Sequence, residues 1–182
     1  FGSEQEIRHL CAIHGFAYDA EIVDAQSDVD ACRLATQHVS SGRADALMKG
    51  MTDTSVILRE VLNKEYGLRT GRLLSHLAVY SLKTYPKLLY ITDAGMNIAP
   101  DAEAKRDILN NAIAFCHAMG LTEPKIAVVC AKEKVDPNMP STLDAERLVA
   151  WNAEGSIPGA IVEGPFGMDN AINADAAAHV RL

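Results

Sequence analysis

The sequence contains no long apolar run and few aromatic residues. No hydrophobic stretch approaches the ~20 residues that a membrane-spanning helix needs, and no signal-peptide pattern opens the chain. Aromatic residues make up 5% of the 182 residues, charged residues 23% and hydrophobic residues 48%, a composition typical of ordinary soluble proteins with a sizeable core. A formal net charge of −7 argues against a general nucleic-acid or acidic-membrane binder, which would carry a basic surface. We therefore expect a cytoplasmic protein without a nucleic-acid or membrane partner.

Several motifs of catalytic and metal sites are also missing. The four cysteines are scattered without a C-x-x-C pair, and no Cys/His spacing suggests zinc, so we expect reduced thiols and no metal site. The Walker pattern G-x-x-x-x-G-K-[ST] and the G-x-S-x-G elbow are absent. The sequence thus carries neither a P-loop nor the nucleophile turn of an α/β hydrolase.

Short β-rich runs alternate with longer helical patterns along the chain. The order predicts βαβα, then an antiparallel hairpin, then βαβα again, which favours a three-layer α/β architecture with a mostly parallel sheet. Gly, Arg and Thr interrupt the periodicity at 67–72, so we predict residues 1–70 to be part of a first α/β domain and residues 71–182 a second one, incomplete at its C-terminus. Strands are predicted around 21–24 and at 44–50, 75–82, 87–94, 125–131 and 159–166, and the main helices at 4–14, 28–42, 52–67, 100–120, 141–155 and 168–180.

The stretch KGMTDTSVILREVL, residues 49–62, places polar residues directly before and within an apolar run. Free backbone N–H groups and the positive dipole end of a helix form a generic anion site. Helical side chains lean toward the N-terminus, so Arg59 points along the face that leads back to Lys49. The spacing allows Lys49, Thr54, Ser55 and Arg59 to converge on one phosphate. The alternative interpretation is an ordinary capped helix with a solvated arginine.

Two further strands end in an acid and an amide, in YITDAGMN (90–97) and EGPFGMDN (163–170). In open α/β sheets ligands bind at the carboxyl ends of strands, so the polar strand ends point to one crevice. The alternative is that each aspartate only caps the turn or helix that follows it. These ends, and the Ser-His pair that begins the strand at 75–82, supply the further cleft candidates Ser75, His76, Asp93, Asn97, Asp169 and Asn170.

Several of these motifs are more specific in combination than alone. They lie in the segments ADALMKGMTDTSVILREVL, GLRTGRLLSHLAVY, LLYITDAGMNIAPDAEAKRDILNNAI, KIAVVCAKEKVDPNMPSTLDA and GAIVEGPFGMDNAI. The spacing of Thr54 and Arg59, the T-D-A-x-M-N-I-x-P turn and the G-P-x-x-x-D-N-A segment closely resemble the phosphate acetyltransferase and phosphate butyryltransferase family. The likeness runs over nearly the whole chain, and the Ser-His and Asn-Ile-Ala-Pro stretches are more similar to the butyryl or acetyl/butyryl branch.

This resemblance implies a two-domain α/β protein related to the isocitrate and isopropylmalate dehydrogenase fold, normally a homodimer. It implies an acyltransferase that moves a short acyl group reversibly between acyl phosphate and coenzyme A, without a metal or a tightly bound cofactor. Coenzyme A, acyl phosphate and phosphate are then the small-molecule substrates. In the family the thiolate of coenzyme A attacks the acyl carbonyl in the interdomain cleft, and the matching Arg59, with Thr54 beside it, serves the anion-binding part.

The chain departs from the family pattern at both ends. From the resemblance we expect the family's first strand and helix to lie outside these residues, together with the C-terminal segment that carries a Ser-Arg pair and the acid usually proposed as general base, so no catalytic residue is assigned. We expect the 182 residues alone to be inactive or very weakly active. Two alternatives stay open: a metal- and NAD-dependent decarboxylating dehydrogenase-like protein of the same fold, and an inactive module that only binds coenzyme A.

Overall fold

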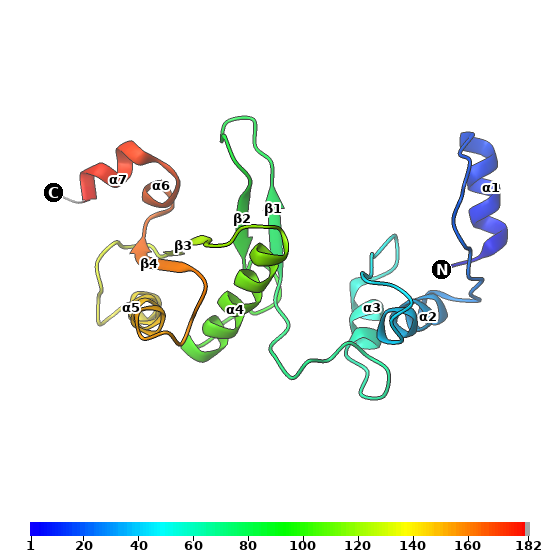
Figure 1. Cartoon of the computed structure of the whole chain (residues 1–182), viewed down its shortest axis with the longest axis horizontal. Coiled ribbons are helices and arrows are strands. Elements are labelled where there is room, and N and C mark those ends of the chain that lie inside the picture. Colours follow the sequence, from blue (N-terminus) through cyan, green and yellow to red (C-terminus); the bar gives the residue numbers. More distant parts are fainter. Residues whose placement is uncertain (181–182) are drawn as a thin grey trace. The chain divides into compact units, whose positions relative to one another are not determined.

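The computed structural model describes residues 1–180, in which helices and short strands form an α/β fold (Figure 1). The chain divides into two compact units, Phe1–Arg72 and Leu73–Leu182. The assignment of residues 1–70 and 71–182 to two domains of a complete protein stays a prediction. None of the described helices is long and apolar enough to cross a membrane.

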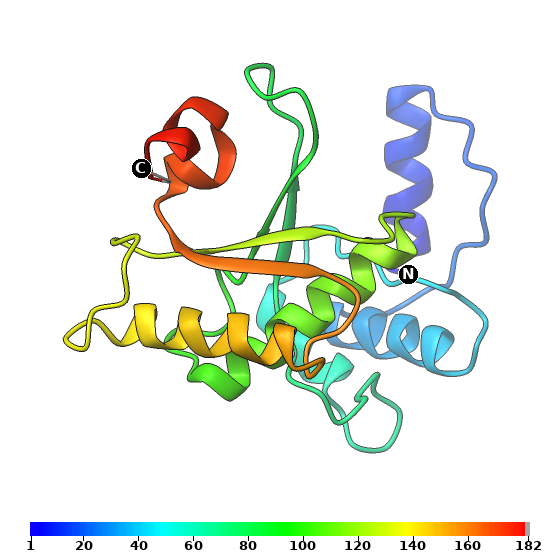
Figure 2. The same ribbon diagram turned by 60° about the vertical axis from the view of Figure 1, so that its left-hand side comes forward.

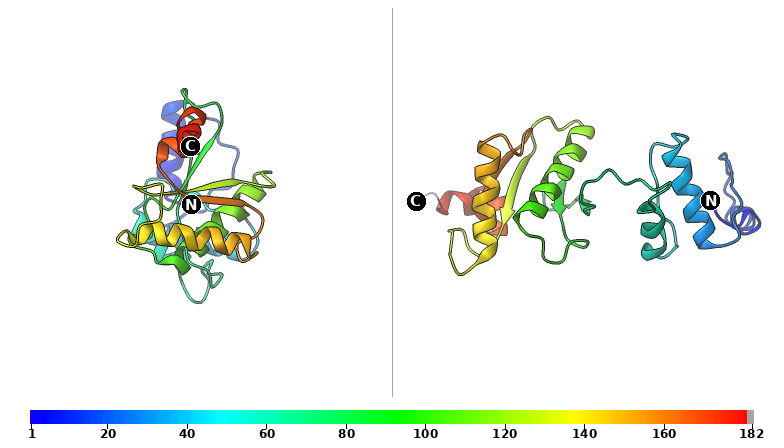
Figure 3. Two further views of the ribbon diagram at one scale, coloured as in Figure 1. Left: turned by 90° about the vertical axis from the view of Figure 1, so that its left-hand side faces the viewer. Right: turned by 90° about the horizontal axis from the view of Figure 1, so that it is seen from below.

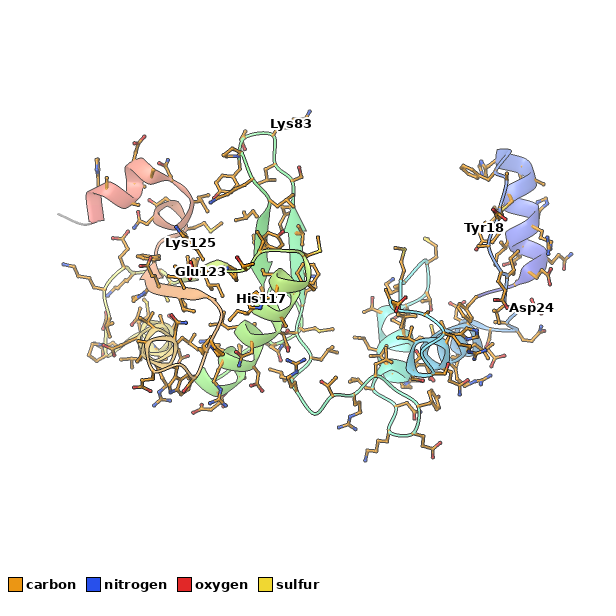
Figure 4. All side chains as sticks on the ribbon, viewed as in Figure 1. Tyr18, Asp24, Lys83, His117, Glu123 and Lys125 are labelled. Carbon is orange, nitrogen blue, oxygen red and sulfur yellow. The ribbon has the colours of Figure 1, made fainter. Side chains whose placement is uncertain are left out.

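The first unit contains the helices α1 (Glu4–His14), α2 (Asp28–Ser40) and α3 (Thr54–Val61). All three begin after a residue whose side chain accepts a hydrogen bond from a backbone N–H of the first turn, the preferred N-cap arrangement. α2 packs on α3 and buries its small side chains against it. Asp24 Oδ1 accepts from the N–H of Glu4 at 2.8 Å, which ties the loop after α1 to the start of that helix (Figure 4). The buried side chains of this helix pair include Cys32, Ala35, Thr36, Ile57 and Glu60.

Two predicted strands of the first unit do not form. The prediction around residues 21–24 was wrong, because Asp24 makes only an isolated bridge to Gly2. The prediction at 44–50 was also wrong, since this segment is a loop in which Met48 is 92% exposed. A strand is stable only when a neighbour satisfies its backbone N–H and C=O groups. Within residues 1–72 the only such pairing is the bridge at Gly2 and Asp24, which is too short to form a ladder, and local β propensity is not sufficient.

The second unit contains two separate two-stranded sheets. β1 (Leu77–Tyr80) and β2 (Leu89–Thr92) pair antiparallel, which confirms the predicted hairpin, and Figure 4 shows Lys83 at its tip. β3 (Lys125–Val129) and β4 (Ile161–Phe166) pair in parallel with α5 between them in the chain. The single, mostly parallel sheet was therefore a wrong prediction for the described residues, because no backbone ladder joins the two pairs.

The core of the second unit lies between β3–β4 and two helices. α5 (Pro140–Ala153) runs along one face of the strand pair (Figure 2), and α4 (Ala102–Ala118) lies beside α5 (Figure 3). Burying a Leu, Ile or Val side chain contributes roughly 1.5–3 kcal/mol each, so this cluster stabilises the unit substantially. Its buried members are Leu109, Ile113, Leu148, Ile157 and Val162.

The last predicted helix, 168–180, is two helices in the structure. α6 (Met168–Ile172) ends at Asn173, and α7 (Ala174–Val180) follows directly. Asn173 has extended dihedral angles, and its side chain accepts the N–H of Asp175 at 2.9 Å. Asparagine is a preferred N-cap residue, so Asn173 ends the predicted helix and caps the start of α7.

Gly164 in β4 allows β3 and β4 to approach closely. Its φ is +151°, and a Cβ there would lie 2.8 Å from the carbonyl oxygen of Val128. We expect Gly164→Ala to lower the free energy of unfolding by about 2–4 kcal/mol, since backbone strain and overpacking each cost roughly 1–3 kcal/mol. Urea titration followed by fluorescence of Trp151, the one tryptophan, measures the second unit alone.

Gly155→Ala is the matched control for this variant. Gly155 also has a positive φ, +82°, but open space where a Cβ would lie. The free energy of unfolding of Gly155→Ala should fall by only about 1 kcal/mol, the cost of placing an alanine at a positive φ. Equal losses in the two variants would contradict the steric role of Gly164.

Candidate functional site

A lysine and an aspartate hold the loop that precedes α3. The ammonium of Lys49 donates to the carbonyl oxygens of Gly50 at 3.2 Å and Thr52 at 2.8 Å. Asp53 is the N-cap of α3, and its carboxylate accepts from the N–H of Ser55 at 2.7 Å. The hydroxyl and N–H of Ser55 lower the pKa of Asp53 against the effect of burial, and Lys49 lowers it further. The cation and the carboxylate therefore stabilise this loop and the helix start.

The predicted phosphate-binding residues of α3 are exposed. Thr54, Ser55 and Arg59 lie on the surface, and the guanidinium of Arg59 makes no hydrogen bond or ion pair with any residue in 1–180. Ser55 and Arg59 are four residues apart and so share a helix face. On the buried side, Glu60 accepts a hydrogen bond from Tyr66 Oη at 2.6 Å. The structure thus groups Thr54, Ser55 and Arg59 on one helix, with the Lys49 ammonium engaged by the loop, and their convergence on one phosphate stays a prediction.

Asp93, directly after β2, accepts hydrogen bonds from four donors. Its Oδ1 accepts from the backbone N–H groups of Gly95 and Met96, both at 2.9 Å. Its Oδ2 accepts from Asn97 Nδ2 at 2.6 Å and from the N–H of His76 at 3.1 Å. The carboxylate therefore caps the turn, as one interpretation of the sequence held, and also ties that turn to the start of β1.

The electrostatics of Asp93 follow from these contacts. Partial burial acts to raise the pKa of its carboxyl group, but the four donors outweigh this effect and hold the pKa well below its usual range. A carboxylate that is fully occupied by protein donors is a poor proton acceptor. The geometry indicates that Asp93 organises the site.

Further hydrogen bonds fix the segment Leu73–His76, which leads into β1. Thr92 Oγ1 donates to the carbonyl oxygen of His76 at 2.6 Å, and Asn97 Nδ2 donates to that of Leu74 at 3.1 Å. Asn111 Nδ2, from α4, donates to the carbonyl oxygen of Leu73 at 2.7 Å and to Ser75 Oγ at 3.0 Å. The candidates Ser75, His76, Asp93 and Asn97 are thereby brought together in one network.

Asn111 was missed by the sequence reasoning, although the sequence contains a signal for it. It lies three residues after Ile108 and four before Phe115, on the same apolar stripe of α4. Asparagine is a poor residue for a helix interior, because its side chain competes for backbone groups. A polar residue on an apolar stripe needs a partner, and here the partner is the Leu73–His76 segment.

The third predicted group lies where β3 and β4 end. Asn170 Nδ2 donates to Glu133 Oε1, which joins α6 to the loop after β3. Asp169 is exposed in the first turn of α6, but the N-cap of that helix is Gly167, so the alternative in which Asp169 caps it was wrong. Asp169 lies after the parallel strand pair β3–β4, whereas Asp93 lies after the antiparallel pair β1–β2. The two residues therefore follow different sheets, and the crevice that they were expected to share stays a prediction. Within residues 1–180 no three His, Cys, Asp or Glu side chains lie close enough to hold a metal ion.

Comparison with solved structures shows that this α/β fold is similar to that of a phosphotransacylase. Residues 3–181 match the family described as phosphate acetyl/butaryl transferase. The chain belongs to that family.

Individual relatives agree with this assignment. The chain is 43% identical over 179 residues to phosphate butyryltransferase of Clostridium beijerinckii, covering 98% of this chain and 59% of the relative. It is 39% identical over 178 residues to phosphate acetyltransferase of Thermotoga maritima, covering 97% and 60%. Among solved structures it resembles a branched-chain phosphotransacylase from Enterococcus faecalis V583, with a TM-score of 0.78, 34% identity, and coverage of 87% and 56%. The chain therefore spans little more than half the length of these relatives.

Replacing the Asp93 carboxylate should destabilise the second unit. Asp93→Asn puts an amide where four donors converge. We expect the free energy of unfolding to fall by about 1.5–3 kcal/mol at pH 7, the usual contribution of a hydrogen bond to a charged group. Because the folded pKa is depressed, this stabilisation is present above the unfolded pKa of about 3.9 and is lost as pH falls toward the folded value. The difference in free energy of unfolding between wild type and variant should therefore become smaller as the pH falls from about 5 to about 2.

Urea titrations followed by Trp151 fluorescence across this pH range measure the effect. Asp107→Asn is the control, since the Asp107 carboxylate accepts no hydrogen bond within residues 1–180, and the free energy of unfolding should stay within about 0.5 kcal/mol of the wild-type value. A wild-type–variant difference that is independent of pH would show that the Asp93 charge does not matter.

Proposed function

We propose that the complete protein is a phosphate acyltransferase that moves a short acyl group, acetyl or butyryl, reversibly between acyl phosphate and coenzyme A. Family membership over nearly the whole chain supports this proposal. Relatives named phosphate butyryltransferase and phosphate acetyltransferase support it as well. Coenzyme A acts as a substrate in this reaction, and no tightly bound cofactor is needed.

The reaction is an acyl substitution. The sulfur of coenzyme A attacks the acyl carbonyl carbon, a C–S bond forms, and the bond from that carbon to the phosphate oxygen breaks. Phosphate leaves with the bonding electron pair, and a base outside the residues assigned here takes the thiol proton. Negative charge develops on the carbonyl oxygen and the leaving phosphate, so cations and hydroxyl donors stabilise the transition state.

The observation that carries the proposal for the phosphate site is the exposed side of α3. The Arg59 guanidinium has no partner within residues 1–180 and shares this helix with the exposed hydroxyls of Thr54 and Ser55. Guanidinium groups bind phosphate bidentately. We assign Arg59 and Thr54 to the phosphate, and Lys49 to holding the loop before the helix.

The same family relationship supports three finer proposals. The complete protein has the two-domain fold of isocitrate and isopropylmalate dehydrogenases, it forms a homodimer, and it acts in the cytoplasm. The dehydrogenase alternative is not favoured, because a divalent-metal site needs clustered acids. Asp93 accepts four protein donors, and Asp169 follows a different sheet.

The direct test is an assay of the complete gene product with acetyl phosphate and butyryl phosphate as donors and coenzyme A as acceptor. Thioester formation that releases one phosphate per acyl-CoA is the expected result. Binding of coenzyme A without turnover would instead support the binding-module alternative. We expect the 182 residues alone to show little or no transfer.

Removing the Arg59 guanidinium should impair catalysis without affecting folding. We expect Arg59→Ala to lower kcat/KM for acyl phosphate by about 100-fold or more, the size seen when one preorganised donor is lost. The free energy of unfolding should change by less than about 0.5 kcal/mol, since the side chain is exposed. Arg69→Ala, which removes another exposed arginine of the same unit, is the control and should keep wild-type activity. Unchanged kcat/KM in Arg59→Ala would contradict the assignment of Arg59 to the phosphate.

A further inference from the structure

One side chain of α4 reaches both the main chain and the serine of the Leu73–His76 segment. The two hydrogens on Asn111 Nδ2 go to the carbonyl oxygen of Leu73 at 2.7 Å and to Ser75 Oγ at 3.0 Å. Asn111 and Ser75 are both half-buried. The two bonds fix the position of the hydroxyl relative to its own backbone.

The direction of this second bond decides what the Ser75 hydroxyl can do. Its oxygen accepts from the amide, so its own hydrogen remains available as a donor. No acceptor for that hydrogen lies within residues 1–180. The residues on either side of Ser75 are also fixed: Leu74 bonds to Asn97, and His76 bonds to Thr92 and Asp93. The hydroxyl therefore lies on a strand start that is held on both sides.

We propose that Ser75 donates a hydrogen bond to an anionic oxygen of the acyl-phosphate substrate, and that Asn111 is the positioning residue that aims this hydroxyl. The assignment rests on the proposed function for the identity of the ligand. A hydroxyl that already accepts one hydrogen bond is a stronger donor, because hydrogen-bonded chains polarise one another. A donor held in place before the substrate binds stabilises developing charge without reorganisation.

A double-mutant cycle on the complete gene product tests the pair. Ser75→Ala and Asn111→Ala should each lower kcat/KM for acyl phosphate by about 10-fold or more, as expected for loss of an aligned donor. The KM for coenzyme A should stay within about twofold in both variants, since the bond is made to the other substrate. The double variant should be no more than about twofold worse than Ser75→Ala, because Asn111 acts through the hydroxyl.

A matched control separates this role from a general effect on α4. Asn110 is the neighbouring residue on the same helix, and its side chain makes no hydrogen bond within residues 1–180. Asn110→Ala should therefore keep wild-type kcat/KM. Asn111→Asp retains the shape of the side chain but replaces the donor by a carboxylate that accepts a hydrogen bond from the Ser75 hydroxyl, and it should lose at least as much activity as Asn111→Ala.

Three results would overturn the proposal. These are wild-type turnover in Ser75→Ala, wild-type turnover in Asn111→Ala, and losses that multiply in the double variant, which would mean that Asn111 acts elsewhere. If the unchanged protein made no acyl-CoA, the proposed function would fail. Calorimetric titration with inorganic phosphate would then decide the Ser75 contact: weaker binding in Ser75→Ala and Asn111→Ala than in Asn110→Ala supports it, and equal binding rejects it.

Discussion

The carboxylate of Asp93 is the interaction on which the candidate site of the second unit depends. Its two oxygens accept four donors from the turn after β2 and from the start of β1. All four partners are donors, so the group is held as an anion, and the depressed pKa reflects this. A proton or a metal ion at this carboxylate would have to displace hydrogen bonds that define the turn. Its role is to set the geometry of the strand ends.

The first unit shows how a helix start can be occupied before any ligand binds. Asp53 caps α3, and Lys49 binds two carbonyl oxygens of the preceding loop. A carboxylate at this position already satisfies the helix dipole and would repel a second anion placed there. An anion-binding role for α3 therefore depends on its exposed side chains, Thr54, Ser55 and Arg59, more than on the free N–H groups of its end.

The sequence predicted features whose cause is local and missed features whose cause is distant. The hairpin at Lys83–Pro86 and most of the helices follow from caps, periodicity and turn residues and were found near the expected positions, although the helix predicted at 52–67 ends at Val61 and that predicted at 168–180 is two helices. The strand at 44–50 failed because a strand depends on a neighbour that the local sequence does not specify. Asp93 was identified as a polar strand end, but its four donors, including the N–H of His76, depend on how β1 pairs with β2. The contact between Asn111 and Ser75 spans 36 positions and needs the packed helix.

Asn97 and Asn111 belong to the same hydrogen-bond network as Asp93 and act in it as donors. A side-chain amide nitrogen carries two hydrogens, so one asparagine can bond to a main-chain carbonyl and to a second acceptor at once. Asn97 does so with Leu74 and Asp93, and Asn111 with Leu73 and Ser75. The Asp93 carboxylate thus accepts four donors, and each of the two amide nitrogens donates to two acceptors. The combination of acid and amide that in the sequence suggested a ligand site is therefore, in the fold, the support for the strand start. Of the residues it supports, Ser75 keeps a hydroxyl hydrogen with no acceptor within residues 1–180, and for that reason ligand recognition is expected at this residue and not at Asp93.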